Sequence, residues 1–170
     1  MAGTESGNRM NLETFVQRNY MEKILCDANR RFRDMSNGQF ELKLINVEDA
    51  GEGKNKGLDL EVYSIVTGKT RSVNTLSGGE SFMAALSLAL GMADQIQAAT
   101  AAIHLDVMFI DEGFGSLSDN ARNEAVNILK EMAGKQRQIG IISHVSELKD
   151  EIENQLIVKK DDRGSHISWR

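Results

Sequence analysis

The sequence predicts an α/β fold: a mostly parallel sheet with flanking helices, plus a small antiparallel β portion. Two observations lead to this prediction. In the second half, helical segments alternate with short apolar strands, as parallel sheets with crossover helices require. In the first third, apolar and polar residues alternate between turn residues, as in antiparallel strands. With 170 residues, the chain is of a length that usually forms one domain.

The first expected element is a long helix. Apolar residues recur at helical spacing from Leu12 to Met35, and Asn37-Gly38 provides a stop signal. We therefore divide the chain into residues 1–11, which are disordered or were added for expression, a leading helix at residues 12–36, and a main domain at residues 37–170. The strands expected next are Phe40–Val47, Leu58–Val66 and Lys69–Val73, the last two joined by a turn at Thr67-Gly68.

The second half is predicted to alternate between helices and strands. Helices are expected from about Ser77 to Ala99, at Asp119–Ala133 and near Ser146–Ile152. Strands are expected at Leu105–Ile110, Ile139–Ile142, Leu156–Lys160 and His166–Trp169.

Composition and charge exclude some functional classes. The net charge of −5 does not favour a standalone nucleic-acid binder. The longest apolar run, Phe82–Ala93, is shorter than the roughly 20 residues of a membrane span, so we expect no membrane partner. The single cysteine, Cys26, cannot form an internal disulfide, which suits a reducing compartment. We expect it to be a buried thiol without a chemical role.

An acidic pair follows an apolar strand. Asp111-Glu112 comes directly after Val107–Ile110, which we expect to be buried on both faces. Ligands of open α/β sheets bind at the carboxyl ends of the strands. One carboxylate there could orient a magnesium ion on nucleotide phosphates, and the next could accept a proton from attacking water. The alternative is a solvated pair of acids without a role.

A histidine follows the next strand. His144 comes after IGIIS and should lie at the carboxyl end of a strand beside the acidic pair. An imidazole there could hydrogen-bond a terminal phosphate or the attacking water. Otherwise it is a loop histidine satisfied by the backbone.

The stretch NTLSGGESFMAAL marks the start of the second long helix. Ser77 and Glu80 fit the S-x-x-E capping box. Capping does not explain Gly78 and Gly79, since glycine inside a helix costs about 1 kcal/mol relative to alanine. Glycines at a helix start let N–H groups approach an anion closely, so the pair favours a phosphate-binding role.

A phosphate-binding loop is not recognisable in the chain. Gly68-Lys69-Thr70 matches the end of G-x-x-x-x-G-K-[ST], but Tyr63 stands where the first glycine is needed. We interpret these residues as a hairpin turn. The lysine that holds the β- and γ-phosphates is therefore missing.

A basic cluster lies near the end of the leading helix. Arg30, Arg31 and Arg33 form it, and Lys54 and Lys56 lie in a later polar loop. Such clusters are usually solvated helix faces, and contact with DNA phosphates is the alternative.

Three motifs in this order, LSGGE, VMFIDEGFG and ISHV, resemble those of the ATP-binding-cassette family. More narrowly, the chain is similar to the C-terminal end of the SbcC family, bacterial DNA-repair ATPases related to SMC proteins. The likeness extends over about residues 12–170 and includes ANRRFRDMSNGQFEL, TLSGGESFMAALSLALGMAD and FIDEGFGSLS. The residues Glu112–Gly115 distinguish the SbcC family from SMC and RecN proteins, which generally have Glu-Val-Asp at this place. Transporters usually have glutamine at Glu80.

The resemblance implies that the chain is the C-terminal half of an ABC-type ATPase head. Its partners would be an N-terminal P-loop lobe of the same protein, reached through a coiled coil that residues 12–36 end, and a second copy of the head. Two ATP molecules with Mg²⁺ would lie between the heads. Within its own head, Asp111 would orient Mg²⁺ through water, Glu112 would be the general base and His144 would sense the γ-phosphate. The resemblance further implies a signature motif acting on the opposite head, Ser77, Gly78, Gly79 and Glu80, and a D-loop, Gly115, Ser116, Leu117, Ser118 and Asp119.

The implied function is ATP hydrolysis in a complex that repairs DNA double-strand breaks. An SbcD-like subunit would supply the nuclease, DNA would bind the assembly, and the location would be the bacterial cytoplasm at the nucleoid. The isolated chain is expected to be inactive. One alternative is an SMC- or RecN-type clamp in which slow hydrolysis only gates opening, and another is a non-catalytic interaction domain with decayed motifs. The sequence departs from the family at Ser118, where aspartate is usual and Asp119 follows one place later.

Overall fold

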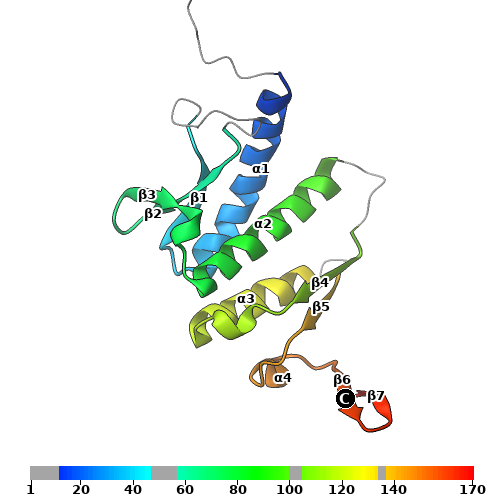
Figure 1. The fold of residues 1–170 in the computed structure, drawn as a ribbon. Coiled ribbons are helices and arrows are strands. Elements are labelled where there is room, and N and C mark those ends of the chain that lie inside the picture. The colour runs from blue at the N-terminus through cyan, green and yellow to red at the C-terminus, as the bar shows by residue number, and fades with distance from the viewer. Residues whose placement is uncertain (1–11, 47–56, 100–104, 134–136) are drawn as a thin grey trace, which may run out of the picture.

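The computed structural model describes residues 12–46, 57–99, 105–133 and 137–170 (Figure 1). Expectations for residues 1–11 and for Lys54 and Lys56 lie outside the described residues. The helices are α1 (Leu12–Met35), α2 (Gly78–Ala99), α3 (Asp119–Ala133) and α4 (Leu148–Glu151), with short 3₁₀ turns η1 (Val73–Thr75) and η2 (Phe114–Ser116). The strands are β1 (Phe40–Leu44), β2 (Leu60–Ser64), β3 (Lys69–Ser72), β4 (Val107–Asp111), β5 (Gln138–Ile142), β6 (Leu156–Asp161) and β7 (Gly164–Trp169).

The predicted α/β class is confirmed. Strands β1, β2 and β3 form an antiparallel sheet in that order, β4 and β5 form a parallel pair, and β6 and β7 form an antiparallel hairpin. The parallel portion within the described residues is thus two strands wide. Gly68 lies in the turn of the β2–β3 hairpin with φ 65°, and Lys69 and Thr70 are the first residues of β3, so the interpretation as a hairpin turn is correct.

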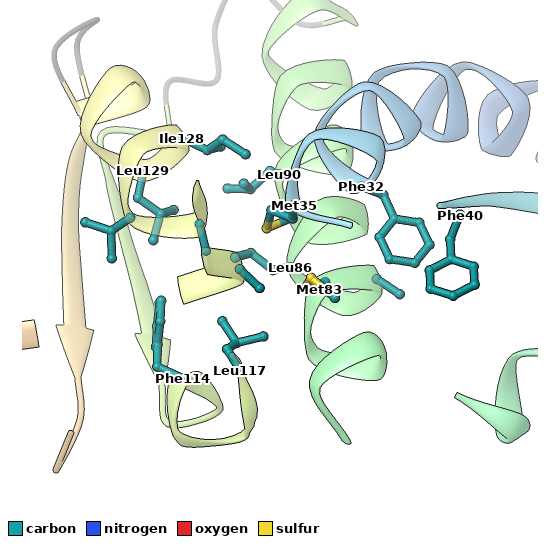
Figure 2. Close-up of a cluster of buried hydrophobic side chains, with 14 of the residues drawn as sticks. Phe32, Met35, Phe40, Met83, Leu86, Leu90, Phe114, Leu117, Ile128 and Leu129 are labelled. Carbon is teal, nitrogen blue, oxygen red and sulfur yellow. The ribbon is translucent and has the colours of Figure 1, made fainter. Parts of the chain in front are cut away.

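Helices α1 and α2 cross and form the centre of the core (Figures 1 and 2). Their backbones approach closely at Gly91, where an added Cβ would lie 2.7 Å from the carbonyl oxygen of Ile24. The buried stripe of α1 carries Leu25, Ala28, Phe32 and Met35. Cys26 lies off this stripe and is exposed. The expectation of a buried thiol is therefore wrong, because the helical period turns position 26 toward solvent.

Helix α2 is the one described helix that is long and apolar enough, by length and composition, to cross a membrane. In the structure it packs against α1 and η2. The side chains of Met83, Leu86 and Leu90 are buried in the common core. A core helix of a folded protein can therefore be as long and as apolar as a membrane span. Its composition therefore reflects its central position in the fold.

The strand β4 is covered on one face only. Met108 and Ile110 pack against the core together with Ile139 and Ile141 of β5. On the opposite face Val107 and Phe109 are exposed, Phe109 by 71%. The expectation of a strand buried on both faces is thus wrong for this chain, because helices cover one side of the β4–β5 pair and no described element covers the other.

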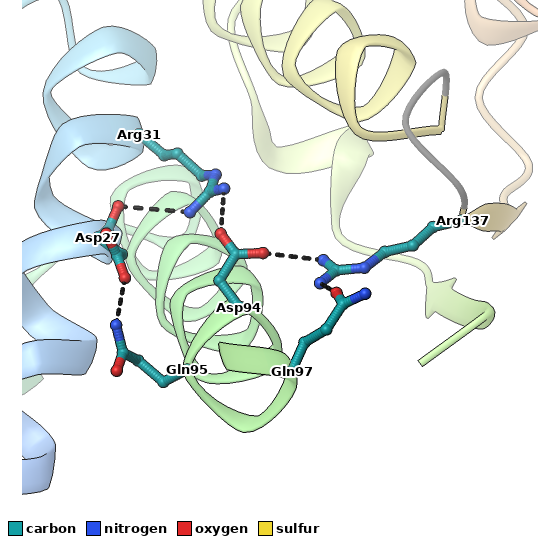
Figure 3. A network of polar contacts seen from close by, with 6 residues as sticks. All are labelled: Asp27, Arg31, Asp94, Gln95, Gln97 and Arg137. Carbon is teal, nitrogen blue, oxygen red and sulfur yellow. Dashed lines mark hydrogen bonds and ion pairs between the residues drawn. The ribbon is translucent and has the colours of Figure 1, made fainter. Parts of the chain in front are cut away.

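A polar network joins α1, α2 and the start of β5 (Figure 3). Asp94 on α2 accepts from Arg31 at 2.5 Å and from Arg137 at 3.0 Å, and both arginines are buried. Arg33 pairs with Glu41 on β1. The prediction of a solvated face is therefore correct for Arg30 and Arg33, which are exposed. It is wrong for Arg31, which is buried and paired with Asp94.

Candidate functional site

The acidic pair lies at the carboxyl end of β4, as expected. Asp111 is the last residue of the strand and pairs with Ile142 across the parallel ladder. The N–H of Glu112 then donates to the carbonyl oxygen of Ile142 at 2.9 Å, which extends the pairing by one residue. Both carboxylates are exposed. The sheet therefore fixes the backbone of the pair while the side chains remain open to a ligand.

His144 meets Glu112 at this edge. Because β4 and β5 are parallel and adjacent, their carboxyl ends lie together. Nδ1 of His144 lies 2.8 Å from Oε2 of Glu112 and can donate to it. Donation from Nδ1 orients the imidazole and leaves Nε2 free for another partner. The structure thus brings together two residues that lie 32 positions apart in the sequence.

A glycine with a positive φ turns the chain after the pair. Glu112 has φ 58° and Gly113 has φ 93°, so two consecutive residues are left-handed. A Cβ on Gly113 would lie 2.1 Å from the ring of Phe82. Phe82 in turn packs edge-on against the buried Phe114, with ring centroids 5.0 Å apart. Sequence reasoning did not identify this support, although the glycine directly after two acids was a usable signal.

The start of α2 is a capping box, as predicted. The N–H of Glu80 donates to Oγ of Ser77 at 3.3 Å, and the N–H of Ser77 donates to Oε2 of Glu80 at 2.7 Å. Gly78 and Gly79 are the first residues of the helix, and N–H groups at these positions receive no carbonyl from the helix itself. The geometry therefore leaves two backbone donors available to an anion.

The two glycines have different local reasons. A Cβ on Gly79 would lie 2.6 Å from the carbonyl oxygen of Ser116, whereas one on Gly78 would meet only the Cβ of Ser116, at 3.7 Å. Gly79 is thus required by packing between α2 and the segment after β4. Phosphate binding was the only reason considered for both glycines from the sequence. The packing contact accounts for Gly79 and does not account for Gly78.

Arg71 on β3 is a contributor that sequence reasoning missed. Its Nη1 donates to the carbonyl oxygen and Oγ1 of Thr75, at 2.6 and 2.9 Å. Its Nη2 lies 3.6 Å from Oε2 of Glu80. The arginine precedes Glu80 by nine residues on a different element, so no helical or strand spacing connected the two.

The segment Gly115–Asp119 joins the two halves of the site. Ser118 caps α3, with the N–H of Ala121 donating to its Oγ at 3.4 Å. Arg122 holds this segment by donating to the carbonyl oxygen of Leu117 and by pairing with Asp119, both at 3.2 Å. Capping by Ser118 was predicted and is confirmed. The carboxylate of Asp119, at the shifted position, pairs with Arg122 and stays exposed.

The side chains at the end of β4 provide only some of the ligands that a magnesium nucleotide needs. Carboxylate oxygens such as those of Asp111 are what Mg²⁺ prefers. Among the described residues, no group of three or more His, Cys, Asp or Glu is arranged to hold a metal. Within residues 57–99, 105–133 and 137–170, Ser77 bonds to Glu80, and Glu112 bonds to His144 and Ile142. The polar groups singled out thus lie at two places, the β4–β5 edge and the start of α2.

Residues 55–131 match the family described as SbcC/RAD50-like, Walker B motif. The SbcC subunit of the nuclease SbcCD from Lactococcus lactis is 41% identical over 165 residues, which cover 94% of this chain and 15% of that relative. The corresponding SbcC subunit from Vibrio cholerae is 45% identical over 168 residues, or 98% of this chain and 16% of the relative. The chain therefore spans less than a fifth of the length of these relatives.

A solved structure described as "Structural biochemistry of ATP-driven dimerization and DNA stimulated activation of SMC ATPases" has a similar fold. The TM-score is 0.70 at 19% identity, covering 92% of this chain and 89% of that one. At this identity the likeness shows the fold alone.

Proposed function

Because the chain belongs to the SbcC family, we propose that it is the C-terminal lobe of the ATPase head of an SbcC-like subunit. The complete subunit would hydrolyse ATP within a nuclease complex for DNA double-strand-break repair. The observation that carries the proposal is the contact of Glu112 with His144 at the adjoining ends of two parallel strands. A carboxylate and an imidazole held at such an edge can activate and orient water beside a phosphate.

The β4–β5 edge would serve the nucleotide of its own head. Mg²⁺, when bound, would neutralise charge on the phosphate oxygens. Asp111 would hold that ion through water. Glu112 would accept a proton from attacking water at its carboxylate, and His144 would hydrogen-bond the γ-phosphate. The 53% exposure of the Glu112 side chain leaves room for water to approach the carboxylate.

The start of α2 would serve the nucleotide of the opposite head. Ser77, Gly78 and Gly79 would face the γ-phosphate, and Glu80 would keep the loop in shape through the capping box. The D-loop segment from Gly115 to Asp119 would line the interface between heads. The capping box supports this division, because it leaves the N–H groups of Gly78 and Gly79 without carbonyl partners from the helix itself.

An N-terminal lobe with the phosphate-binding loop is the first partner that we propose. The exposed apolar face of the β4–β5 pair supports it, because Val107 and Phe109 are 51% and 71% exposed and such faces mark interaction sites. Leu12, Phe15, Val16 and Tyr20 are exposed on the first turns of α1, which supports the end of a coiled coil at residues 12–36. A second head, an SbcD-like nuclease and DNA would complete a cytoplasmic, nucleoid-associated assembly.

The proposal is tested by Glu112→Gln in the full-length subunit with its nuclease partner. Removing the general base should lower the rate of ATP hydrolysis at least about a hundredfold. ATP-dependent dimers should persist, because the amide retains the size of the side chain and its contact with His144. Turnover and dimer formation would be measured on the same preparation, by phosphate release and light scattering.

Glu147→Gln is the matched control. Glu147 is also an exposed glutamate in the loop after β5, and its side chain makes no capping bond. This variant should hydrolyse ATP at the rate of the unchanged protein. Full turnover in Glu112→Gln would remove Glu112 from the role of general base.

A further inference from the structure

Arg71 reaches the start of α2 from the antiparallel sheet. It has three partners: Thr75, which accepts two hydrogen bonds, Glu80, with which it forms an ion pair, and the ring of Phe40, whose centroid lies 5.5 Å from its Cζ. Its side chain is about two thirds buried. The guanidinium is therefore fixed next to the loop from Thr75 to Ser77.

Glu80 places a negative charge at the N-terminus of α2. Its carboxylate receives the N–H of Ser77 at 2.7 Å, and so lies beside the N–H groups of Gly78 and Gly79. A carboxylate in the first turn is favourable for an isolated helix. For a helix start that must receive a phosphate, however, the same negative charge repels the ligand. Within the described residues, Arg71 is the cation paired with Glu80.

We propose that Arg71 is a positioning residue of this anion site, which neutralises Glu80 and shapes the Thr75–Ser77 loop so that α2 can receive a terminal phosphate. This inference rests on the proposed role of the α2 start toward the opposite head. Arg71 acts through Glu80 and Thr75 and does not itself touch the phosphate. The charge of Glu80 is then tolerated only while the arginine is present.

A double-mutant cycle in the full-length subunit tests this proposal. Arg71→Gln should raise the ATP concentration for half-maximal dimerisation at least about tenfold, because Glu80 is left unpaired. Glu80→Gln, in which glutamine still satisfies the capping box, is the reference background. In that background Arg71→Gln should raise the concentration by less than about threefold, because no charge is left for the arginine to neutralise. The double variant should match Glu80→Gln alone. Arg71→Lys, which keeps the charge, should lie between Arg71→Gln and the unchanged protein.

A merely structural role for Arg71 predicts a different pattern. If the arginine only holds Thr75, then Glu80→Gln will not rescue Arg71→Gln, and that result would overturn the proposal. An unchanged ATP requirement in Arg71→Gln would overturn it as well. Arg163→Gln, at an exposed turn between β6 and β7, is the matched control and should have no effect. Thermal unfolding of every variant reports on folding.

Ser77→Ala separates this inference from the proposed function. If Ser77→Ala leaves ATP-dependent dimerisation unchanged, the role of the α2 start fails, and the role of Arg71 fails with it. If Ser77→Ala weakens dimerisation while Arg71→Gln does not, the proposed function stands and only the role of Arg71 is rejected.

Discussion

At the scale of single residues, the turn after β4 decides where the acidic pair points. Glu112 is left-handed, which costs a non-glycine residue roughly 1–2 kcal/mol. The ladder bond to Ile142 and the contact with His144 hold it there. Strained backbone of this kind is commonly found at functional sites. Gly113 then completes the turn with the Phe82 ring directly against its Cα.

We therefore predict that Gly113→Ala lowers the free energy of unfolding more than an alanine substitution at an ordinary left-handed glycine does. The alanine would have to adopt φ 93°, and its methyl group would overlap the Phe82 ring. The free energy of unfolding should therefore fall by about 3 kcal/mol. Gly38→Ala is the control, because Gly38 has φ 73° with nothing within 4 Å of its Cβ. It should cost about 1 kcal/mol. Urea denaturation of the complete head would measure both, and equal losses would contradict this account.

The residue scale was only partly predictable from the sequence. Ser77 with Glu80, Ser118, and the meeting of Glu112 with His144 followed from capping rules and strand ends. The roles of Arg71 and Phe82 could not be predicted. Each contacts a residue of another element, and such a contact produces no periodic pattern in the sequence. Gly79 was assigned to phosphate binding alone because its contact with Ser116 exists only in three dimensions.

At the scale of elements, the Asp94 network connects α1 to the strand that leads to His144. Arg31 lies on α1, Asp94 on α2, and Arg137 directly precedes β5 (Figure 3). Both arginines are about nine-tenths buried, and buried charges are tolerated only when they are paired. One carboxylate therefore fixes the orientation of three elements around the core.

Asp94→Asn tests this connection. The amide can accept from one arginine, but its NH₂ group would face the other, and a buried charge would be left unpaired. The free energy of unfolding should therefore fall by about 3 kcal/mol. Glu22→Gln is the control, because the Glu22–Arg18 pair is more exposed and should matter by less than about 0.5 kcal/mol. A loss below about 1 kcal/mol in Asp94→Asn would contradict the structural importance of the network.

The elements themselves were the most predictable level. Helices α1 and α3 have the expected bounds, and the strands differ from expectation by a few residues at their ends, where assignments vary most. Burial of β4 was not predictable in the same way. Four consecutive apolar residues indicate a strand covered on both faces, but no described element covers Val107 and Phe109.

At the scale of the whole molecule, two apolar surfaces of the described residues are exposed. The hairpin of β6 and β7 exposes Val158, Ile167 and Trp169, each by 64% or more. Residues at paired positions of the hairpin share one face, since Val158 lies opposite Ile167. Together with the open face of β4, these surfaces exceed what single exposed apolar residues explain. They fit a lobe that is completed by another segment of a longer protein.

The proposed function requires two polypeptide segments to join before ATP can be hydrolysed. The most direct measurement is ATP turnover by this chain alone and after assembly with the N-terminal lobe of its own full-length protein. We expect no turnover above background for the chain alone, and turnover on assembly that Glu112→Gln abolishes. Ordinary ATP hydrolysis by the purified chain alone would contradict the claim, because the phosphate-binding lysine would then not be required.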